Sequence, residues 1–255
     1  MNINDLSTQL LYTTVPINGI KSDNSQITGT GFIFSILMEE DTSRSIPLLI
    51  TNYHVLENVT YGYIEFSMAE DNQPIRGKSV RVNFDNTIIK NNKLGPLDLI
   101  AIPIAPAIKD LQSKNTNIFF RTISSDMIPN KQQIEEFAAL EHVIFIGYPN
   151  GLYDTYNKTS IIRQGITASP IWNDFKGEPI FLIDAGVFPG SSGSPVFIFN
   201  QGSYPTKNGI TLGNRLLFVG IISETLLRPG NTYLNLGRVI KSTAMFAELK
   251  KLFNQ

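Results

Sequence analysis

Short apolar runs, each bounded by Gly, Pro or a polar cluster, recur along the whole chain of 255 residues. The 19 Gly and 14 Pro residues are spread through the sequence and do not form one tract. Gly and Pro residues placed between apolar runs in this way are typical of short strands joined by turns. The pattern therefore favours an all-β fold, either a sandwich or a barrel.

The first part of the chain carries at least five strand-like runs rich in Ile, Leu, Val and Phe. The predicted strands are Gly29–Met38, Ile46–Thr51, Tyr61–Met68, Lys78–Phe84 and Leu97–Ile104, with a polar connector at Glu39–Ser45. Five strands are enough for a small closed barrel, so residues 1–110 are predicted to form an N-terminal β-barrel. In residues 111–130, apolar and polar residues no longer alternate regularly, so this segment is predicted to connect the barrel to a second domain.

A second series of strands follows a short predicted helix at Lys131–Leu140. The predicted strands are Val143–Ile146, Ser160–Thr167, Ile180–Asp184, Pro195–Phe199, Leu216–Ser223 and Thr232–Leu236. They predict a second β-barrel over residues 131–240. Apolar residues at near-helical spacing in Arg238–Phe253 predict a C-terminal helix, which we place at residues 241–255.

Charge and cysteine content exclude several classes of function. The formal net charge is −1 with no run of like charges, so the chain lacks the basic surface that binding to nucleic acid requires. It contains no Cys, which excludes a thiol nucleophile and disulfides. Met1–Ile20 lacks the features of a signal peptide, and no stretch is long and apolar enough for a membrane span, so we expect a cytoplasmic location and no membrane partner.

The loop Pro189–Pro195, with the sequence PGSSGSP, is the strongest local motif and leads directly into an apolar run. A nucleophilic serine needs an exposed hydroxyl and nearby backbone N–H groups that converge on the oxyanion it creates. Gly190 allows a backbone conformation in which its own N–H and that of Ser192 point to one spot. Ser192 is thus the candidate nucleophile, and Gly190 and Ser192 are the candidate oxyanion hole. Taken alone, such a loop is more often a plain turn.

His54 and Asp98 supply the other side chains that serine catalysis needs. His54, one of two histidines, follows a buried-looking strand, and Asp98 starts the apolar run Leu99–Ile102, where we expect it to be largely desolvated. A buried carboxylate needs a partner, and an imidazole N–H provides one. The chain order His54, Asp98, Ser192 is that of chymotrypsin. His142 has no acidic residue or second histidine at ligand spacing, so we expect a structural or exposed side chain and no metal site.

Six blocks in one order along the chain resemble those of trypsin-like peptidases, and most closely the bacterial branch with the high-temperature-requirement and glutamyl endopeptidase types. The blocks are Gly29–Phe32, Thr51–His54, Asp98–Ala101, Gly147–Pro149, Gly165–Thr167 and Gly190–Pro195. The resemblance implies two antiparallel six-stranded β-barrels, with the active site in the cleft between them and a C-terminal helix after them. It also implies a serine endopeptidase that acts on protein or peptide substrates through a Ser–His–Asp triad without any cofactor.

The same resemblance assigns supporting roles in the second barrel. Ser223 corresponds to a serine that hydrogen-bonds the triad aspartate, and the substrate is expected to bind as an added antiparallel strand beside Ser223–Thr225. The primary pocket corresponds to Gly186, Val187 and Thr225. None of these residues is acidic, which disfavours basic substrates, and Ile222 replaces the histidine of glutamyl endopeptidases. These positions favour a substrate residue with a small or medium apolar side chain in the primary pocket. Asp184 either lines this pocket or has a structural role.

One departure from the family and two rival functions remain. Animal trypsins have an aspartate before the nucleophile that pairs with a new N-terminal amine, but here the residue is Ser191, so activation by N-terminal cleavage is not expected. Regulation by a protein partner is possible. One rival is a catalytically silent protease fold that binds peptides or assembles with such a partner. The other is an esterase, but its nucleophile precedes a helix, whereas Ser192 precedes a strand.

Overall fold

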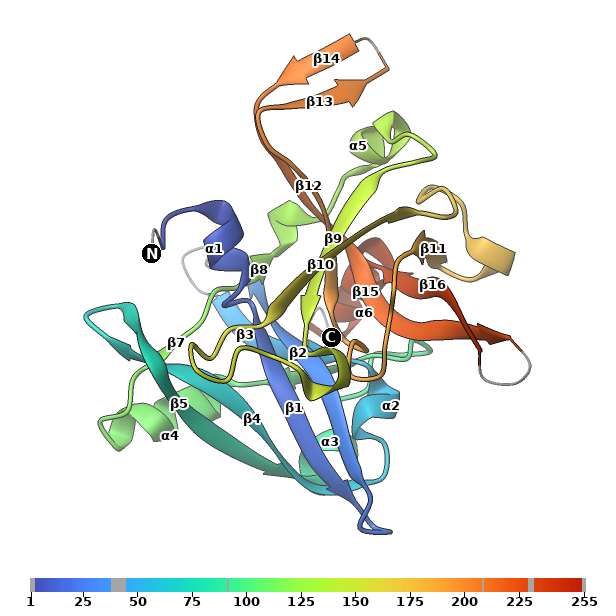
Figure 1. Ribbon diagram of the computed structural model, residues 1–255. Helices are drawn as coiled ribbons and strands as arrows, with labels where there is room; N and C mark the ends of the chain where they lie inside the picture. The colour runs from blue at the N-terminus through green and yellow to red at the C-terminus, as the bar shows by residue number, and fades with distance from the viewer. Residues whose placement is uncertain (1–2, 38–44, 91, 208, 229–231, 254–255) are drawn as a thin grey trace. The chain divides into compact units, whose positions relative to one another are not determined.

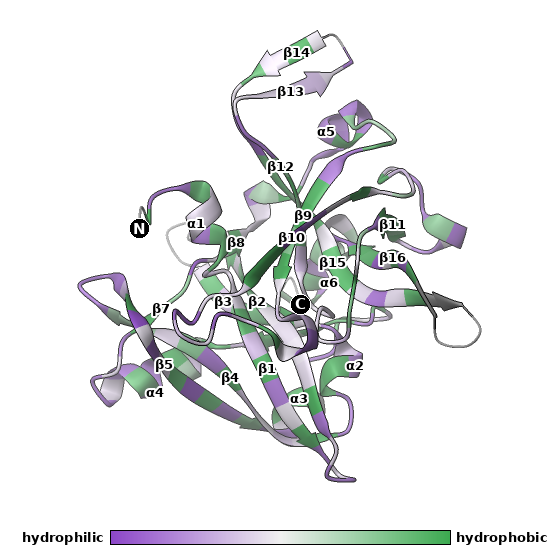
Figure 2. Cartoon of the chain, viewed as in Figure 1, coloured by the Kyte–Doolittle hydropathy of each residue, from purple (hydrophilic) through white to green (hydrophobic). Residues whose placement is uncertain are grey.

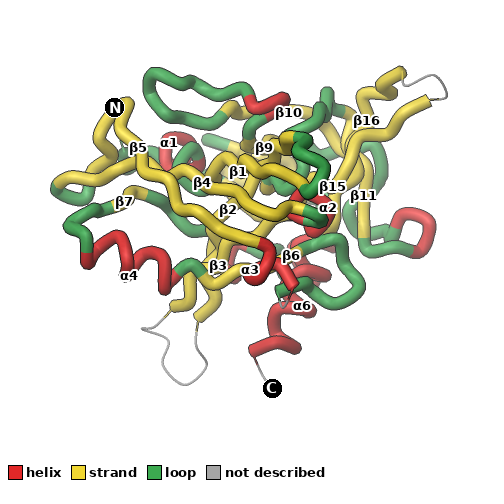
Figure 3. Tube along the Cα trace, turned by 90° about the horizontal axis from the view of Figure 1, so that it is seen from below, coloured by secondary structure: helices red, strands yellow, loops and turns green. Residues whose placement is uncertain are grey.

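The computed structural model describes residues 3–37, 45–90, 92–207, 209–228 and 232–253. Strands are the main regular structure in these residues, and helix is confined to short segments (Figure 3). Most of the connector expected at Glu39–Ser45 lies outside the described residues. Within the described ranges, no helix combines the length and apolar character needed to cross a membrane.

Sixteen strands and six α-helices are present in the described part of the chain (Figure 1). The helices are α1 (Leu6–Leu10), α2 (Tyr53–Leu56), α3 (Asn86–Lys90), α4 (Ala105–Ser113), α5 (Lys131–Glu136) and α6 (Ser242–Phe253). The strands of the first half are β1 (Thr14–Lys21), β2 (Gln26–Leu37), β3 (Ser45–Thr51), β4 (Val59–Glu70), β5 (Gln73–Asp85), β6 (Ile100–Pro103), β7 (Ile118–Phe119) and β8 (Ile123–Ser124). Those of the second half are β9 (His142–Gly147), β10 (Ile161–Thr167), β11 (Ile180–Asp184), β12 (Pro195–Asn200), β13 (Ser203–Thr206), β14 (Gly209–Leu212), β15 (Arg215–Arg228) and β16 (Thr232–Lys241).

The first sheet follows the order β5-β4-β1-β2-β3-β6 with antiparallel neighbours. The short strands β7 and β8 add to β4 and β2, and β8 runs parallel to β2. Hydrophilic and hydrophobic residues alternate along β4 and β5 (Figure 2), as expected for strands with one buried face. The buried faces enclose one apolar core that includes Ile17, Ile33, Leu49 and Phe66.

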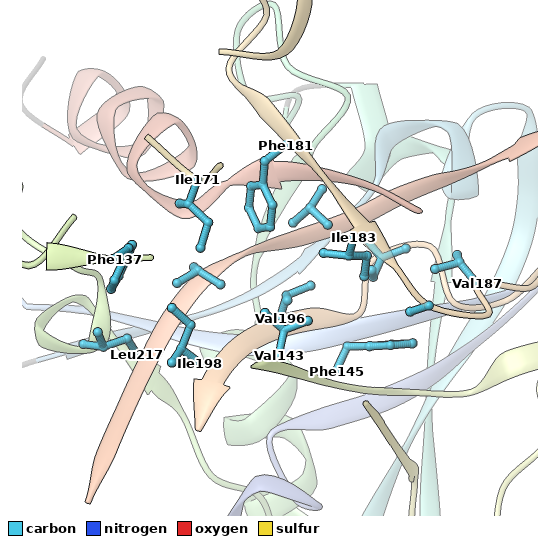
Figure 4. Packing of buried hydrophobic residues seen from close by; sticks show 14 residues of the cluster. Phe137, Val143, Phe145, Ile171, Phe181, Ile183, Val187, Val196, Ile198 and Leu217 are labelled. Carbon is cyan, nitrogen blue, oxygen red and sulfur yellow. The ribbon is translucent and has the colours of Figure 1, made fainter. Parts of the chain in front are cut away.

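The second sheet is a closed barrel in the order β10-β11-β16-β15-β12-β9. Its core is a cluster of buried side chains from these strands and from the loops beside them, including Phe145, Phe181, Val187 and Val196 (Figure 4). The hairpin of β13 and β14 continues from β12 and pairs only within itself among the described strands (Figure 1). The predicted second six-stranded barrel and the C-terminal helix are therefore confirmed.

The chain divides into two compact units. The first comprises residues 1–125, 146–161 and 189–194, and the second comprises residues 126–145, 162–188 and 195–255. This division differs from the expected boundaries at residues 110, 130 and 240, because two later segments return to the first unit. The segment 189–194, which carries Ser192, is one of them, since its backbone is hydrogen-bonded to β2.

Three elements differ from the sequence-based expectation. The helix expected to continue to Leu140 ends at Glu136, because Phe137 turns to extended backbone and buries its ring in the core of the second unit. Lys241, expected to start the terminal helix, is instead the last residue of β16, and α6 begins at Ser242. The expected connection, residues 111–130, contains the end of α4 and the strands β7 and β8, which pair with the first sheet.

Candidate active site

Asp98 clamps His54 through both carboxylate oxygens. Oδ1 accepts the backbone N–H of His54 at 2.9 Å, and Oδ2 lies 2.6 Å from Nδ1 of the imidazole. An ionised carboxylate is only an acceptor, so this contact places the ring proton on Nδ1 and leaves Nε2 as an acceptor. The pair therefore holds His54 in the tautomer that a general base requires.

The backbone around Asp98 fixes the position of this pair. His54 lies in α2, a single helical turn that follows β3 directly. The carbonyl of Asp98 accepts the N–H of Tyr53 at 3.2 Å and the side-chain amide of Asn52 at 2.9 Å. Because Asn52 is fully buried, its amide ties the loop before β6 to the start of the turn that presents His54.

The environment of Asp98 differs from the expected desolvated one. Its side chain is 35% exposed and that of His54 is 43% exposed. Asp98 lies two residues before the start of β6, and the apolar neighbours Leu99 and Ile100 bury their side chains while the carboxylate faces His54. The pair is thus open to solvent and to an approaching substrate.

The nucleophile loop is a tight turn from Ser191 to Ser194. The N–H of Ser194 donates to the carbonyl of Ser191 at 3.0 Å, and Gly193 has a φ of +88°. A positive φ at the third position is the mark of a type II turn and favours Gly there. Ser191, Gly193 and Ser194 are buried, whereas Ser192, at the second position, is half-buried.

Thr30 on β2 connects this turn to the strand that leads to His54. Its N–H donates to the carbonyl of Ser192 at 3.0 Å, and its own carbonyl accepts the hydroxyl of Thr51 at 2.7 Å. Thr51 ends β3, three residues before His54. The approach at Gly193 is so close that a Cβ there would lie 1.9 Å from the Thr30 carbonyl oxygen. Ser192 and His54 are therefore carried by segments that meet at Thr30.

Gly190, the candidate for the oxyanion hole, has a left-handed backbone conformation that favours glycine. Its φ is +85°, and a Cβ there would lie 2.5 Å from the carbonyl oxygen of Tyr148. The carbonyl of Pro189 accepts the N–H of Asn150 at 2.5 Å. In a trans peptide the N–H points opposite to the carbonyl, so the N–H of Gly190 is directed away from Asn150. The loop thus presents this N–H on its other side.

The four expected substrate-binding residues lie in the second unit and take different roles. Val187 buries its side chain in the core (Figure 4), so it contributes packing and not pocket surface. Gly186 and Thr225 are half-buried, and the Thr225 hydroxyl lies 3.5 Å from the carbonyl oxygen of Leu236. Ser223 lies where the register of β15 against β16 shifts. Its predicted bond to Asp98 stays a prediction. His142 is exposed, as expected.

One edge of β15 is open beyond Ile221. On one side β15 pairs with β16 through Thr225 and beyond, but its pairing with β12 ends at the match of Pro195 with Ile221. From Ile222 onward, no described strand covers that second side. The predicted substrate-binding segment Ser223–Thr225 therefore lies on an edge of the second sheet that no described strand covers.

Sequence reasoning overlooked Thr30 and Asn52 as positioning residues. Both are fully buried polar side chains within the motif blocks Gly29–Phe32 and Thr51–His54. A polar residue within an apolar strand, such as Thr30 between Gly29 and Gly31 before Phe32, was the available signal. Burial without a partner would be costly, so such a residue implies a specific hydrogen bond.

Comparisons with known proteins agree with this geometry. In solved structures, the chain superposes on HL collagenase (TM-score 0.55, 11% identity, 97% of this chain and 96% of that one) and on tobacco etch virus protease with substrate (TM-score 0.52, 16% identity, 96% and 86%). It also superposes on the HtrA-type protease AlgW with tripeptide (TM-score 0.53, 15% identity), covering 96% of this chain but only 62% of that one. At these identities the likeness shows the chymotrypsin-like double-barrel fold.

A search of curated protein sequences gave no significant match. The family model described as the trypsin-like peptidase domain, however, matches residues 29–203. That range is more than half of the chain and includes His54, Asp98 and Ser192. The chain therefore belongs to the trypsin-like peptidase domain family.

Proposed function

We propose that this protein is a serine endopeptidase in which Ser192 is the nucleophile, His54 the general base and Asp98 the residue that orients the histidine. The observation that carries the proposal is the two-point contact of Asp98 with His54, and the hydrogen bond between Thr30 and the loop of Ser192 supports it. Family membership implies a peptide or protein substrate.

In the first step, Nε2 of His54 takes the proton of the Ser192 hydroxyl as Oγ attacks the carbonyl carbon of the scissile peptide. The resulting imidazolium is stabilised by the carboxylate of Asp98 at 2.6 Å from Nδ1. His54 then gives the proton to the leaving amine, and the C–N bond breaks to leave an acyl-enzyme. A water molecule, deprotonated by the same imidazole, hydrolyses the ester and restores Ser192.

The negative charge on the substrate oxygen needs fixed donors during both steps. The N–H groups of Gly190 and Ser192 take this role in the proposal, supported by the positive φ of Gly190 and the orientation of the Pro189 carbonyl. Preorganised donors of this kind supply on the order of 3–4 kcal/mol each to the stabilisation of the transition state.

The open edge of β15 supports a mode of substrate binding. An extended peptide can add to Ser223–Thr225 as a further strand through backbone hydrogen bonds, independent of its sequence. The first residue of β12, Pro195, is paired with Ile221, so the edge opens close in sequence to the nucleophile. An endopeptidase needs such an extended site, because it must hold chain on both sides of the scissile bond.

A silent protease fold is the second candidate. One solved structure with the same fold is that of a scabies mite inactivated protease paralogue (TM-score 0.52, 14% identity), so this fold persists in proteins without activity. A peptide-binding protein would use the same edge of β15. A protein partner that alters activity is compatible with either candidate.

Labelling with a fluorophosphonate probe distinguishes the two candidates. We expect covalent labelling of the wild-type protein and cleavage of an unfolded protein such as casein. Ser192→Ala should remove labelling and reduce cleavage by at least about 10⁴-fold without loss of the fold. Ser203→Ala, a substitution at an exposed serine on β13, is the matched control and should label as the wild type does. Absence of labelling in a folded wild-type protein would contradict the proposal.

A further inference from the structure

Arg163 on β10 places its positively charged guanidinium beside the segment expected to form the primary substrate pocket. Its guanidinium carbon lies 4.9 Å from the centre of the Phe188 ring and 5.8 Å from that of Phe145. The side chain is half-buried. Phe188 precedes the nucleophile loop directly, so this cation is anchored to the part of the second unit that continues into Ser192.

The guanidinium fills the space next to Gly186. A Cβ built on Gly186 would lie 2.8 Å from an Nη atom of Arg163 and 3.2 Å from the Phe188 ring. Gly186 thus leaves room for the guanidinium of Arg163. As a result, a positive charge from β10 lies next to Gly186, a residue expected to line the primary pocket. Val187 adds nothing polar there, since its side chain is in the core (Figure 4).

The charge of Arg163 has no carboxylate partner within 4.0 Å among the residues that the structure describes. Other half-buried arginines of the same unit differ: Arg215 reaches Glu141 at 2.7 Å, and Arg238 reaches Glu224 at 2.6 Å. Asp184, on the neighbouring strand β11, is exposed. A half-buried guanidinium on aromatic faces is able to form a bidentate pair with a carboxylate that arrives from outside.

We propose that Arg163 determines specificity by binding the carboxylate of an Asp or Glu residue at the P1 position, the residue on the N-terminal side of the scissile bond. This inference rests on the proposed function, because P1 is defined by cleavage. It opposes the apolar preference inferred from Gly186, Val187, Thr225 and Ile222, which took no account of a residue on β10. The two rings lower the local dielectric and strengthen the pair relative to one in water.

Peptides that differ only in P1 Glu or P1 Gln test this inference, because the two side chains have nearly the same shape. With the wild-type protein we expect kcat/KM for P1 Glu to exceed that for P1 Gln by about 10–100-fold. Arg163→Gln should bring the ratio close to one. If Arg163 only supported Phe188 and the loop, the substitution would lower both rates together and leave the ratio as it was, which would overturn the inference.

Arg121→Gln is the matched control. Arg121 is also half-buried, with its guanidinium carbon 4.4 Å from the centre of the Phe119 ring, but it belongs to the first unit. This variant removes the same charge from a similar surrounding and should keep the Glu to Gln ratio of the wild type. A ratio that falls equally in both variants would show an effect of net charge alone and would also overturn the inference.

A binding measurement separates failure of this inference from failure of the proposed function. Fluorescence anisotropy of peptides that end in Glu or Gln is measured with Ser192→Ala and with Ser192→Ala/Arg163→Gln, both checked for folding by circular dichroism. Tighter binding of the Glu peptide that disappears in the double variant supports the inference even if the wild type cleaves nothing. Cleavage with no preference for Glu supports the proposed function and overturns the inference. Equal or undetectable binding together with absent cleavage overturns both.

Discussion

The hydroxyl of Thr30 donates to the carbonyl of Gly190 at 2.8 Å and accepts the N–H of Tyr148 at 3.0 Å. Thr30 is fully buried, so these are the bonds of a side chain without access to water. One hydroxyl thus joins β2, the end of β9 and the nucleophile loop. We therefore expect the orientation of Gly190, a residue of the candidate oxyanion hole, to depend on this side chain.

Replacing Thr30 with Val tests this dependence. The two side chains have nearly the same shape, but Val leaves the Gly190 carbonyl and the Tyr148 N–H unpaired and buried, at a cost of about 2–4 kcal/mol in the free energy of unfolding. We expect the rate of fluorophosphonate labelling to fall at least about tenfold in the protein that remains folded. Thr30→Ser keeps the hydroxyl and should retain most of the rate; equal losses in the two variants would contradict this role.

Gly193→Ala should disrupt the turn far more than the same substitution at Gly202. Both glycines have similar positive φ values, +88° and +84°. A Cβ at Gly193 would lie 1.9 Å from the Thr30 carbonyl oxygen, whereas a Cβ at Gly202 would meet nothing within 4 Å. We expect a loss of more than about 3 kcal/mol for Gly193→Ala and about 1 kcal/mol for Gly202→Ala by urea denaturation. Similar losses would show that φ alone, and not the contact with Thr30, sets the cost.

Asp98→Asn should reduce kcat by about 10⁴-fold and leave the fold intact. The two contacts with His54 use different oxygens of Asp98, and in an amide one of these positions is an NH₂ donor, so one of the two contacts is lost. If its NH₂ faces Nδ1, it favours the tautomer whose Nε2 carries the proton and cannot act as a base. Peptide turnover and the Tm of the variant measure the two effects. The kcat of Asp184→Asn, a substitution at an exposed carboxylate, should stay within about twofold of the wild-type value. A large loss of kcat in this variant would indicate that Asp184, and not Asp98, is the acidic residue of the triad.

Stability should fall in acid through Glu65, which lies on β4 with its side chain 8% exposed. Burial acts to raise the pKa of Glu65, but hydrogen bonds from Ser79 and Lys158 and the charges of Lys158 and Arg81 outweigh it and lower the pKa below 4.5. A carboxyl whose pKa is lowered by folding stabilises the protein above its unfolded pKa, and this stabilisation is lost as pH falls through the folded pKa.

The difference in unfolding free energy between the wild type and Glu65→Gln should therefore be about 1–3 kcal/mol at pH 7 and should shrink below about pH 4. Urea denaturation at several pH values measures it. Asp110→Asn is the control, since its pair with Lys114 is exposed on both sides and should contribute less than about 0.5 kcal/mol. A difference that does not change with pH would exclude an ionised Glu65 as its source.

Activity should not depend on a newly formed N-terminal amine. The residue before the nucleophile is Ser191, which is buried and carries no charge to pair with such an amine. Protein with a short N-terminal peptide tag and protein from which the tag has been cleaved should label with the fluorophosphonate at the same rate. Labelling only after cleavage would show that activation follows the animal trypsin route after all.

Most strands could be predicted from the sequence, because their apolar runs are bounded by Gly, Pro and Asn. β11 agrees with its predicted bounds, and β3, β10 and β12 differ by one residue at one end. β1 could not be recognised, since Asn18, Gly19 and Lys21 interrupt its apolar residues and its pairing with β2 and β4 decides its conformation. The end of α5 at Glu136 likewise depends on the burial of Phe137, a tertiary effect.

The contact between His54 and Asp98 could be predicted from the sequence, but the surroundings of the pair could not, and the role of Ser192 stays a prediction. His54 and Asp98 lie in contact as expected from their place in ordered motifs. The exposure of Asp98, the anchoring by Thr30 and the position of Arg163 beside Gly186 depend on which strands neighbour each other. Periodicity assigns a residue to a face of its strand but not to a neighbour several strands away.

The compact unit that contains His54 and Asp98 is completed by residues 189–194. During translation this segment leaves the ribosome after strands β1 to β11. A nascent chain can therefore contain both His54 and Asp98 before it contains the hydroxyl of Ser192. The hydroxyl of Thr30 can form its hydrogen bonds with the Gly190 carbonyl and the Tyr148 N–H only after those later segments have been synthesised. In the proposed endopeptidase, the segment that carries the attacking hydroxyl is therefore the last part of this unit to be synthesised.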